Sequence, residues 1–166
     1  MVILGIDPGF GRVGYGIIEV QNNKYRALEY GSITTEANSY FPYRLNKIEK
    51  DLIEVCSRYK IDAASVEELF FNTNITTGIQ VAEARGVIIN TLVNLNIEVN
   101  EYTPLQVKQS LVGYGRADKI QIKNMVKSFL KLQNMPKLDD TTDALALAIC
   151  HSHSNKMNKY IAKQHS

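Results

Sequence analysis

Hydrophobic residues in the first part of the chain follow the pattern of β-strands. Residues 2–6 form a short apolar run that ends at an acidic residue, which is typical of a buried strand. Residues 13–20 and 25–33 are rich in β-branched and aromatic side chains, and Asn22-Asn23 between them is a turn signal. The segments therefore predict an antiparallel meander of three strands.

The hydrophobic period then lengthens to three or four residues, which indicates helices. Helices are predicted at 42–59 and 77–95, and strands at 61–70 and 97–102 alternate with them. The 77–95 segment is apolar on more than one side, so we expect one side to face the sheet and the other to face a second subunit. This order predicts an α/β fold: a mixed five-stranded sheet, with three antiparallel strands and then two parallel ones, flanked by helices.

The region after the last predicted strand has helix start signals. Pro104 occupies the first-turn position that proline tolerates in a helix, and glycines make 113–117 a loop. Asp118 and Gln121 predict a capping box for a helix at 119–132.

The rest of the chain completes one domain and adds a tail. A final helix is expected from about residue 140 to about residue 153, and the polar, basic residues 155–166 are expected to fray. A length of 166 residues suits one domain, here 1–154. The 45% of hydrophobic and 22% of charged residues are ordinary for a globular protein.

Signals for a membrane or a secreted protein are weak. No apolar run reaches the roughly 18 residues of a membrane span, and residues 1–7 lack the basic start of a signal peptide. Cys56 and Cys150 lie among apolar residues at helical spacing and are expected to be buried free thiols. We therefore expect a cytoplasmic protein without membrane contact.

The net charge of +2 hides a segregation of charge along the chain. Residues 105–137 carry seven lysine or arginine residues against one aspartate, a net charge of +6, so the rest of the chain carries −4. Four lysines recur at every fourth residue and form a stripe on the predicted helix: Lys119, Lys123, Lys127 and Lys131. A stripe alone is typical of a solvated surface, but its place between a glycine loop and an acidic helix start favours phosphate contact.

Two predicted strands end in acidic residues. Asp7 ends the first run, and a buried carboxylate there must be paired or bind a metal ion, although an aspartate that only caps a turn is the alternative. Glu67 and Glu68 lie on opposite faces of the strand at 61–70, so only one of them can point with Asp7. A strand parallel to the first and beside it brings its acid to the same edge of the sheet.

A third acidic group starts the final helix. Asp140 and Asp143 are three residues apart and share a helix face, whereas Asp139 fits an N-cap. An acidic helix start is common and is weak evidence alone. Combined with Asp7 and Glu67, however, it predicts about four negative charges in a small space, which hard divalent cations would neutralise. Two Mg²⁺ ions held there would suit phosphodiester hydrolysis.

Several blocks of the sequence resemble the motifs of the RuvC-type Holliday junction resolvases. They occur in the family's order from the first residues to about residue 153: Gly5-Ile6-Asp7-Pro8-Gly9 with Gly14-Tyr15-Gly16, Val66-Glu67-Glu68-Leu69-Phe70, Ala84-Arg85-Gly86, Gln106-Val107-Lys108-Gln109 and Asp140-Thr141-Thr142-Asp143-Ala144-Leu145-Ala146. The predicted order of elements is also that of the ribonuclease H-like fold. Glu68 departs from the pattern, because many relatives have glutamine there.

This resemblance implies a structure-selective endonuclease that resolves four-way DNA junctions by paired symmetric nicks in recombination and repair. It implies two Mg²⁺ ions per subunit, for which Mn²⁺ substitutes. The implied catalytic and metal-binding acids are Asp7, Glu67, Asp140 and Asp143. The implied partners are four-way junction DNA, a second copy of the chain, and the RuvA–RuvB branch-migration complex.

The resemblance also implies DNA-binding residues. Lys108 and Lys119 are expected to contact phosphates, and Phe70 to act as an aromatic wedge at the opened junction, although the residues alone leave core packing open for Phe70. Arg85, from a matching motif, and Lys123, from the lysine stripe, are further DNA-binding candidates.

Other functions fit the sequence less well. Residues 9–14 match G-x-G-x-x-G, but a predicted strand follows where a dinucleotide site needs a helix. A sugar-kinase-like or actin-like ATPase needs two such domains, and a protein that only binds junctions needs no acidic cluster. A nuclease for RNA–DNA hybrids fits the acids equally well. His151 and His153 do not share a helix face, so we expect a solvated helix end rather than a metal site.

Overall fold

The five-stranded sheet of the protein has the strand order β3-β2-β1-β4-β5. The computed structural model describes the backbone of residues 1–69 and 75–164 and the side chains of residues 1–69 and 77–155. The strands are β1 (Val2–Asp7), β2 (Arg12–Gln21), β3 (Lys24–Thr34), β4 (Ala63–Glu67) and β5 (Glu98–Tyr102). β1 pairs antiparallel with β2 and parallel with β4, and β5 continues the parallel part. The predicted mixed sheet is therefore confirmed.

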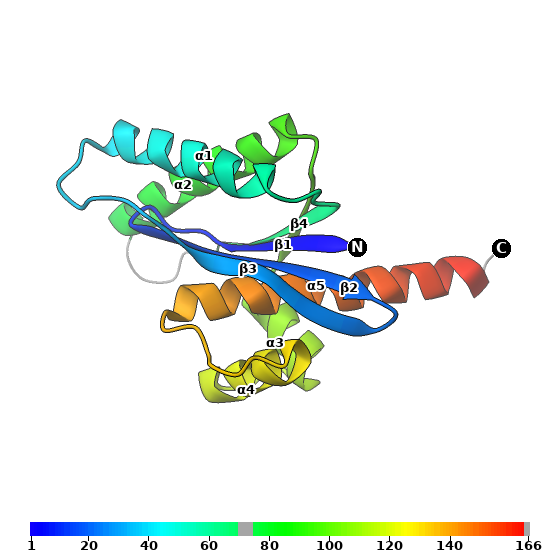
Figure 1. Ribbon diagram of the computed structural model, residues 1–166. Coiled ribbons are helices and arrows are strands. Elements are labelled where there is room, and N and C mark those ends of the chain that lie inside the picture. The colour runs from blue at the N-terminus through cyan, green and yellow to red at the C-terminus, as the bar shows by residue number, and fades with distance from the viewer. Residues whose placement is uncertain (70–74, 165–166) are drawn as a thin grey trace.

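Helices cover both faces of this sheet (Figure 1). One face carries α1 (Phe41–Ser57) and α2 (Ile75–Asn94), and the other carries α3 (Pro104–Val112), α4 (Lys119–Leu130) and α5 (Asp139–Gln164). Central strand β1 is buried on both sides because successive side chains point to opposite faces. Ile3 joins the core under α3, α4 and α5, whereas Leu4 and Ile6 join the core under α1 and α2.

Glycines let α5 approach the sheet closely. A Cβ atom added to Gly5 on β1 would lie 1.8 Å from the carbonyl oxygen of Ala144, and one added to Gly14 on β2 would lie 2.1 Å from that of Asp140. Any larger residue at either position would push the helix away. The N-terminal part of α5 consequently lies directly against β1 and β2.

Capping boxes start two of the three helices on the α5 side. In α4, the Asp118 carboxylate accepts from the Gln121 main-chain N–H at 2.8 Å, and the Gln121 side chain accepts from the Asp118 N–H at 2.9 Å, as predicted. Thr103 and Gln106 make the same reciprocal pair at the start of α3. These bonds satisfy main-chain donors that a helix start otherwise leaves free.

The C-terminal ends of α4 and α5 differ from the predictions. α4 ends at Leu130 rather than at 132, because Lys131 adopts a left-handed conformation with φ of 51° and caps the helix. α5 continues to Gln164 rather than ending near residue 153, so the predicted frayed segment is helical through most of its length. The boundary of the domain at 154 stays a prediction.

The solvated position predicted for the two histidines is wrong for His151. This residue is only 3% exposed, and its Nδ1 lies 2.9 Å from the hydroxyl of Tyr102. The prediction failed because α5 does not end there but runs on between the sheet and α3. The predicted buried free thiols, Cys56 and Cys150, are confirmed.

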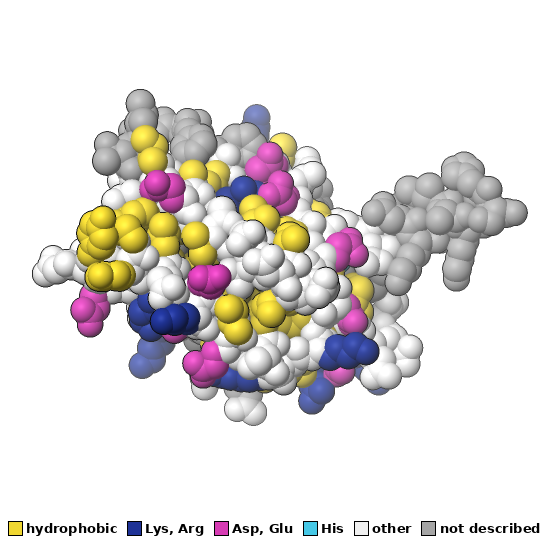
Figure 2. Space-filling view, turned by 90° about the horizontal axis from the view of Figure 1, so that it is seen from above, with side chains coloured by type: hydrophobic (Ala, Val, Ile, Leu, Met, Phe, Trp, Pro, Cys, Tyr) yellow, Lys and Arg dark blue, Asp and Glu magenta, His cyan; other side chains and the backbone are white. Residues whose placement is uncertain are grey.

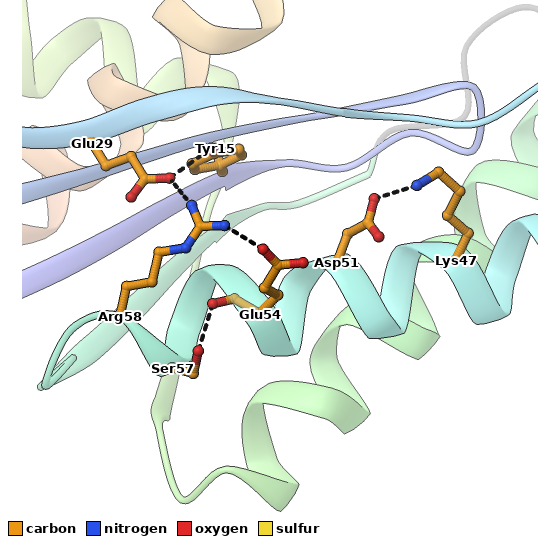
Figure 3. A network of polar contacts seen from close by, with 7 residues as sticks. All are labelled: Tyr15, Glu29, Lys47, Asp51, Glu54, Ser57 and Arg58. Carbon is orange, nitrogen blue, oxygen red and sulfur yellow. Dashed lines mark hydrogen bonds and ion pairs between the residues drawn. The ribbon is translucent and has the colours of Figure 1, made fainter.

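A polar network fastens α1 to the outer strands (Figure 3). Arg58, which caps α1, pairs with Glu29 of β3 and Glu54 of α1, both at 2.6 Å. Glu29 also accepts from the hydroxyl of Tyr15 at 3.0 Å. This network lies on the sheet face opposite to α5.

Among the described residues, no helix has the length and apolar character required to cross a bilayer.

Candidate active site

The parallel pairing of β1 and β4 brings two predicted acids together. The register aligns Ile6 with Val66, so Asp7 and Glu67 are the last residues of adjacent strands. The two carboxyl groups lie close enough for each to affect the pKa of the other. Glu68 is exposed on the other side of the strand end, so the structure assigns the inward position to Glu67.

The N-terminal part of α5 adds two further acids. Asp140 and Asp143 both interact electrostatically with Asp7, which puts all four acids in one cluster. Arg12 at the start of β2 lies 3.4 Å from the Asp140 carboxylate and pairs weakly with it. The close contact that Gly14 permits between β2 and Asp140 explains why this part of α5 reaches the sheet edge.

The electrostatics of the cluster favour binding of a cation. Burial and the neighbouring charges, first Glu67 and then Asp143 and Asp140, raise the pKa of Asp7 to about 8. Burial, and then repulsion by Asp143, also raises the pKa of Glu67, and burial raises the pKa of Asp143. Partly buried carboxylates with raised pKa values form a site where a divalent cation would compete with protons and neutralise the charges.

The donor set fits Mg²⁺ in its chemistry. Mg²⁺ prefers carboxylate oxygens together with water and substrate phosphate. Among residues 1–69 and 77–155, no three acidic, histidine or cysteine side chains are already arranged around one metal position.

Two of the predicted phosphate-binding lysines lie beside these acids. Lys108 of α3 and Lys119 of α4 line a cavity of about 240 Å³, whose wall also includes Glu67 and Asp143. The charge of Lys119 lowers the pKa of both acids, against the effect of burial. The cavity thus places positive charge next to the acidic cluster, as a site for a phosphodiester requires.

Asp139 holds two lysines of the predicted stripe. Its carboxylate lies 2.7 Å from Nζ of Lys123 and 3.6 Å from Nζ of Lys119, and these contacts lower its pKa. Asp139 is the first residue of α5 rather than its N-cap, so the N-cap interpretation is wrong. The sequence contained no sign of this pairing, which depends on how α4 packs beside α5.

The remaining DNA-binding candidates have different positions. Arg85 of α2 contacts protein groups, the main-chain carbonyl of Glu67 and the side chain of Glu101, and the DNA contact expected for it stays a prediction. Sequence reasoning missed Glu101, because nothing in the spacing of residues along the chain indicates that β5 meets Arg85 of α2. Phe70 lies outside the described residues.

Comparison with known proteins identifies the family of the chain. The family model described as crossover junction endodeoxyribonuclease RuvC matches residues 3–151. The protein of that name from Clostridioides difficile is 54% identical over 96% of this chain and 94% of its own length. The one from Alkaliphilus oremlandii is 51% identical over 96% of this chain and 97% of its own length.

Solved structures give the same result. The structure titled T. thermophilus RuvC in complex with Holliday junction substrate superposes with a TM-score of 0.91 and 33% identity, over 95% of this chain and 96% of that one. The fowlpox virus resolvase, also solved with Holliday junction DNA, is 18% identical with a TM-score of 0.61 over 92% of this chain and 99% of its own, so it supports the fold alone. The chain therefore belongs to the RuvC family of crossover junction endodeoxyribonucleases.

Proposed function

We propose that this endonuclease resolves Holliday junctions by cutting two strands of four-way DNA at symmetric positions. The observation that carries the proposal is the meeting of carboxylates from β1, β4 and α5 beside Lys108 and Lys119. Acids for a metal-assisted hydrolysis and cations for a DNA backbone then lie within one cavity. The relative from T. thermophilus was solved with a Holliday junction, which supports the same substrate here.

The chain's own residues would divide the work of strand cleavage. Asp7, Glu67, Asp140 and Asp143 would hold two Mg²⁺ ions per subunit, or Mn²⁺ in their place. When bound, such a pair of ions activates water and stabilises the leaving 3′-oxygen of a phosphodiester. Lys108 and Lys119 would hold the phosphate next to the acids, and Lys123 would contact the backbone farther along α4. Phe70 as a wedge at the junction stays a prediction.

A homodimer would supply the two active sites that paired nicks require. On α2, Ile79 and Val93 are 54% and 57% exposed, and Gly86 lies midway between them on the same face. Figure 2 looks onto the α1–α2 side and shows hydrophobic side chains at the surface there. A Cβ atom on Gly86 would meet open space, so within one subunit nothing requires glycine. We assign this face of α2 to the partner subunit. Cooperation with a RuvA–RuvB complex stays a prediction.

A cleavage assay tests the proposed function. The protein is incubated with a mobile four-way junction, a plain duplex and an RNA–DNA hybrid, each with Mg²⁺ and with EDTA. We expect symmetric nicks in the junction alone, with 5′-phosphate and 3′-hydroxyl ends, and no cutting in EDTA. Asp7→Asn should abolish cleavage and keep junction binding. Asp51→Asn, at a surface pair with Lys47 on α1, is the matched control and should cut normally.

Two results would contradict the proposal. Cutting of the hybrid with the junction untouched would keep the acidic site but assign it to another substrate. Cleavage of the junction by Asp7→Asn at the normal rate would remove Asp7 from the catalytic group.

A further inference from the structure

Arg85 connects α2 to the end of the strand that carries Glu67. Its Nε donates to the main-chain carbonyl oxygen of Glu67 at 3.0 Å, and its Nη2 donates to the carboxylate of Glu101 on β5. The side chain is 18% exposed, and both of its contacts are to protein groups. Neighbouring Ala84 and Ile88 are completely buried against the sheet, so the helix that carries Arg85 is firmly seated.

The bond from Arg85 reaches the chain where the sheet no longer supports it on both sides. Pairing between β1 and β4 ends at Ile6 and Val66, one residue before Glu67. Glu67 itself still pairs with Tyr102 of β5, and the next N–H, that of Glu68, donates to the Tyr102 carbonyl at 2.9 Å. On the β1 side, the pairing with β1 has ended before Glu67, and the main-chain carbonyl of Glu67 accepts a hydrogen bond from Arg85.

The position of this carbonyl determines where the Glu67 carboxylate points. Rotation of the last peptide group of a strand moves the side chain attached beside it, and a metal ligand must be held within a fraction of an ångström. Glu101 in turn holds the guanidinium from the other side. One planar group with several donors can satisfy both acceptors at once, which an ammonium group cannot do with the same geometry.

We propose that Arg85 is a positioning residue for the catalytic reaction: it holds the Glu67 carboxylate in its working place through the Glu67 carbonyl, with Glu101 as its support. This inference rests on the proposed function of the acidic cluster. Arg85 acts through the main chain and not as a charge on the carboxylate, since the cation that stabilises ionised Glu67 is Lys119. Arg85 is next to Gly86 on α2. The helix whose exposed face we assign to the dimer interface therefore also holds the end of β4, which carries Glu67.

Two other roles for Arg85 make different predictions. A DNA contact, expected from the sequence, would weaken junction binding and flatten its salt dependence by about one in the logarithmic slope. A role only in packing would lower the melting temperature without a specific effect on turnover. A positioning role lowers kcat and weakens metal binding, while junction binding in EDTA is unchanged.

The experiment compares Arg85→Gln, Arg85→Lys and Glu101→Gln with the unaltered full-length protein. For each, kcat and KM for junction cleavage are measured over a Mg²⁺ titration, and junction affinity is measured in EDTA at several salt concentrations. The rise in melting temperature with added Mn²⁺ alone reports metal binding without reference to activity. Arg58→Gln is the matched control, because Arg58 also joins a helix to a strand by ion pairs (Figure 3), but its partners are Glu29 and Glu54 rather than the acidic cluster.

We expect Arg85→Gln to lower kcat about 10- to 100-fold and to raise the half-saturating Mg²⁺ concentration, as loss of a group that orients a metal ligand does. Arg85→Lys should recover part of the loss, Glu101→Gln should lose less than Arg85→Gln, and Arg58→Gln should lose nothing in kcat. Junction affinity in EDTA should stay within about twofold and keep its salt slope.

Three outcomes would overturn the role proposed for Arg85. In the first, Arg85→Gln has a normal kcat and is stabilised normally by Mn²⁺. In the second, its loss of activity is explained by weaker junction binding with a flatter salt slope. In the third, Arg58→Gln loses as much kcat as Arg85→Gln when the two proteins have lost the same amount of melting temperature. Failure of the proposed function would look different, because the unaltered protein would then not cut the junction. The Mn²⁺ stabilisation of Arg85→Gln would still decide whether Arg85 supports the acidic cluster.

Discussion

Replacement of Asp7 by asparagine should change how the stability of the metal-free protein depends on pH. In the fold, the pKa of Asp7 is raised from 3.8 to about 8 by burial and by the neighbouring acids. The folded protein therefore keeps a proton that the unfolded chain loses. The stabilising effect of that proton is complete below pH 3.8 and is lost progressively as the pH rises to about 8.

The magnitude follows from the difference between the two pKa values. One pKa unit corresponds to about 1.4 kcal/mol, so a rise from 3.8 to about 8 sets an upper limit of roughly 5–6 kcal/mol. Water reaches the edge of the cluster and screens its charges, so we expect the proton on Asp7 to contribute about 2–3 kcal/mol to the free energy of unfolding. Asp7→Asn has no charge at this position. Its unfolding free energy should therefore fall less than that of the unaltered protein between pH 5 and pH 8.5, by most of that amount.

Urea unfolding in EDTA measures this difference. The chain has no tryptophan, so unfolding is followed by far-ultraviolet circular dichroism. Protein concentration is kept fixed because dimerisation would add to the apparent stability. Asp51→Asn is the control and should follow the unaltered protein. Mg²⁺ should restore the stability of the unaltered protein at pH 8.5 but have a much smaller effect on Asp7→Asn.

One result would refute the reasoning about the acidic cluster. If Asp7→Asn and the unaltered protein lose the same stability between pH 5 and pH 8.5 without metal, Asp7 does not carry a raised pKa in the folded protein.

Three further changes test other parts of the site. Lys119→Ala should weaken junction binding several-fold and reduce the salt slope by about one, measured by fluorescence anisotropy; an unchanged slope would mean that Lys119 contacts no phosphate. Asp139→Asn should tighten junction binding a few-fold in the same assay, because it frees Lys119 and Lys123 and removes a charge that repels phosphate; weaker binding would contradict this. Gly86→Leu should fold, because its side chain meets open space, but should sediment as a monomer. The control Gly86→Ala should stabilise α2 by up to about 1 kcal/mol, whereas a Gly86→Leu protein that stays dimeric would exclude this face of α2 as the interface.

The sequence carried most of the information about fold class, because periodicity and caps are local properties. The meander, the alternating helices and strands, and the capping box of Asp118 and Gln121 were all readable from spacing. Element ends were less predictable. The helix end at Lys131 depends on a left-handed residue that has no glycine to signal it, and α5 runs past residue 153 although its polar composition indicated fraying.

The candidate site was only partly readable for a related reason. Acids at strand ends and at a helix start identify Asp7 and the α5 pair as candidates. The hydrophobic pattern alone leaves Glu67 and Glu68 equivalent, and before the register of β4 was known only the resemblance to the RuvC motifs favoured Glu67. His151 was expected in solvent and is buried, because burial depends on what packs against a helix and not on its own composition.

The sequence by itself therefore determined the elements, the acids and lysines available for chemistry, and the family to which the chain belongs. Only the tertiary structure decided which of these groups meet. The pairing of Asp139 with Lys119 and Lys123, and the contact of Arg85 with Glu67 and Glu101, join residues on different elements. Such contacts follow from how helices and strands pack across the sheet, and sequence spacing contains no measure of that distance.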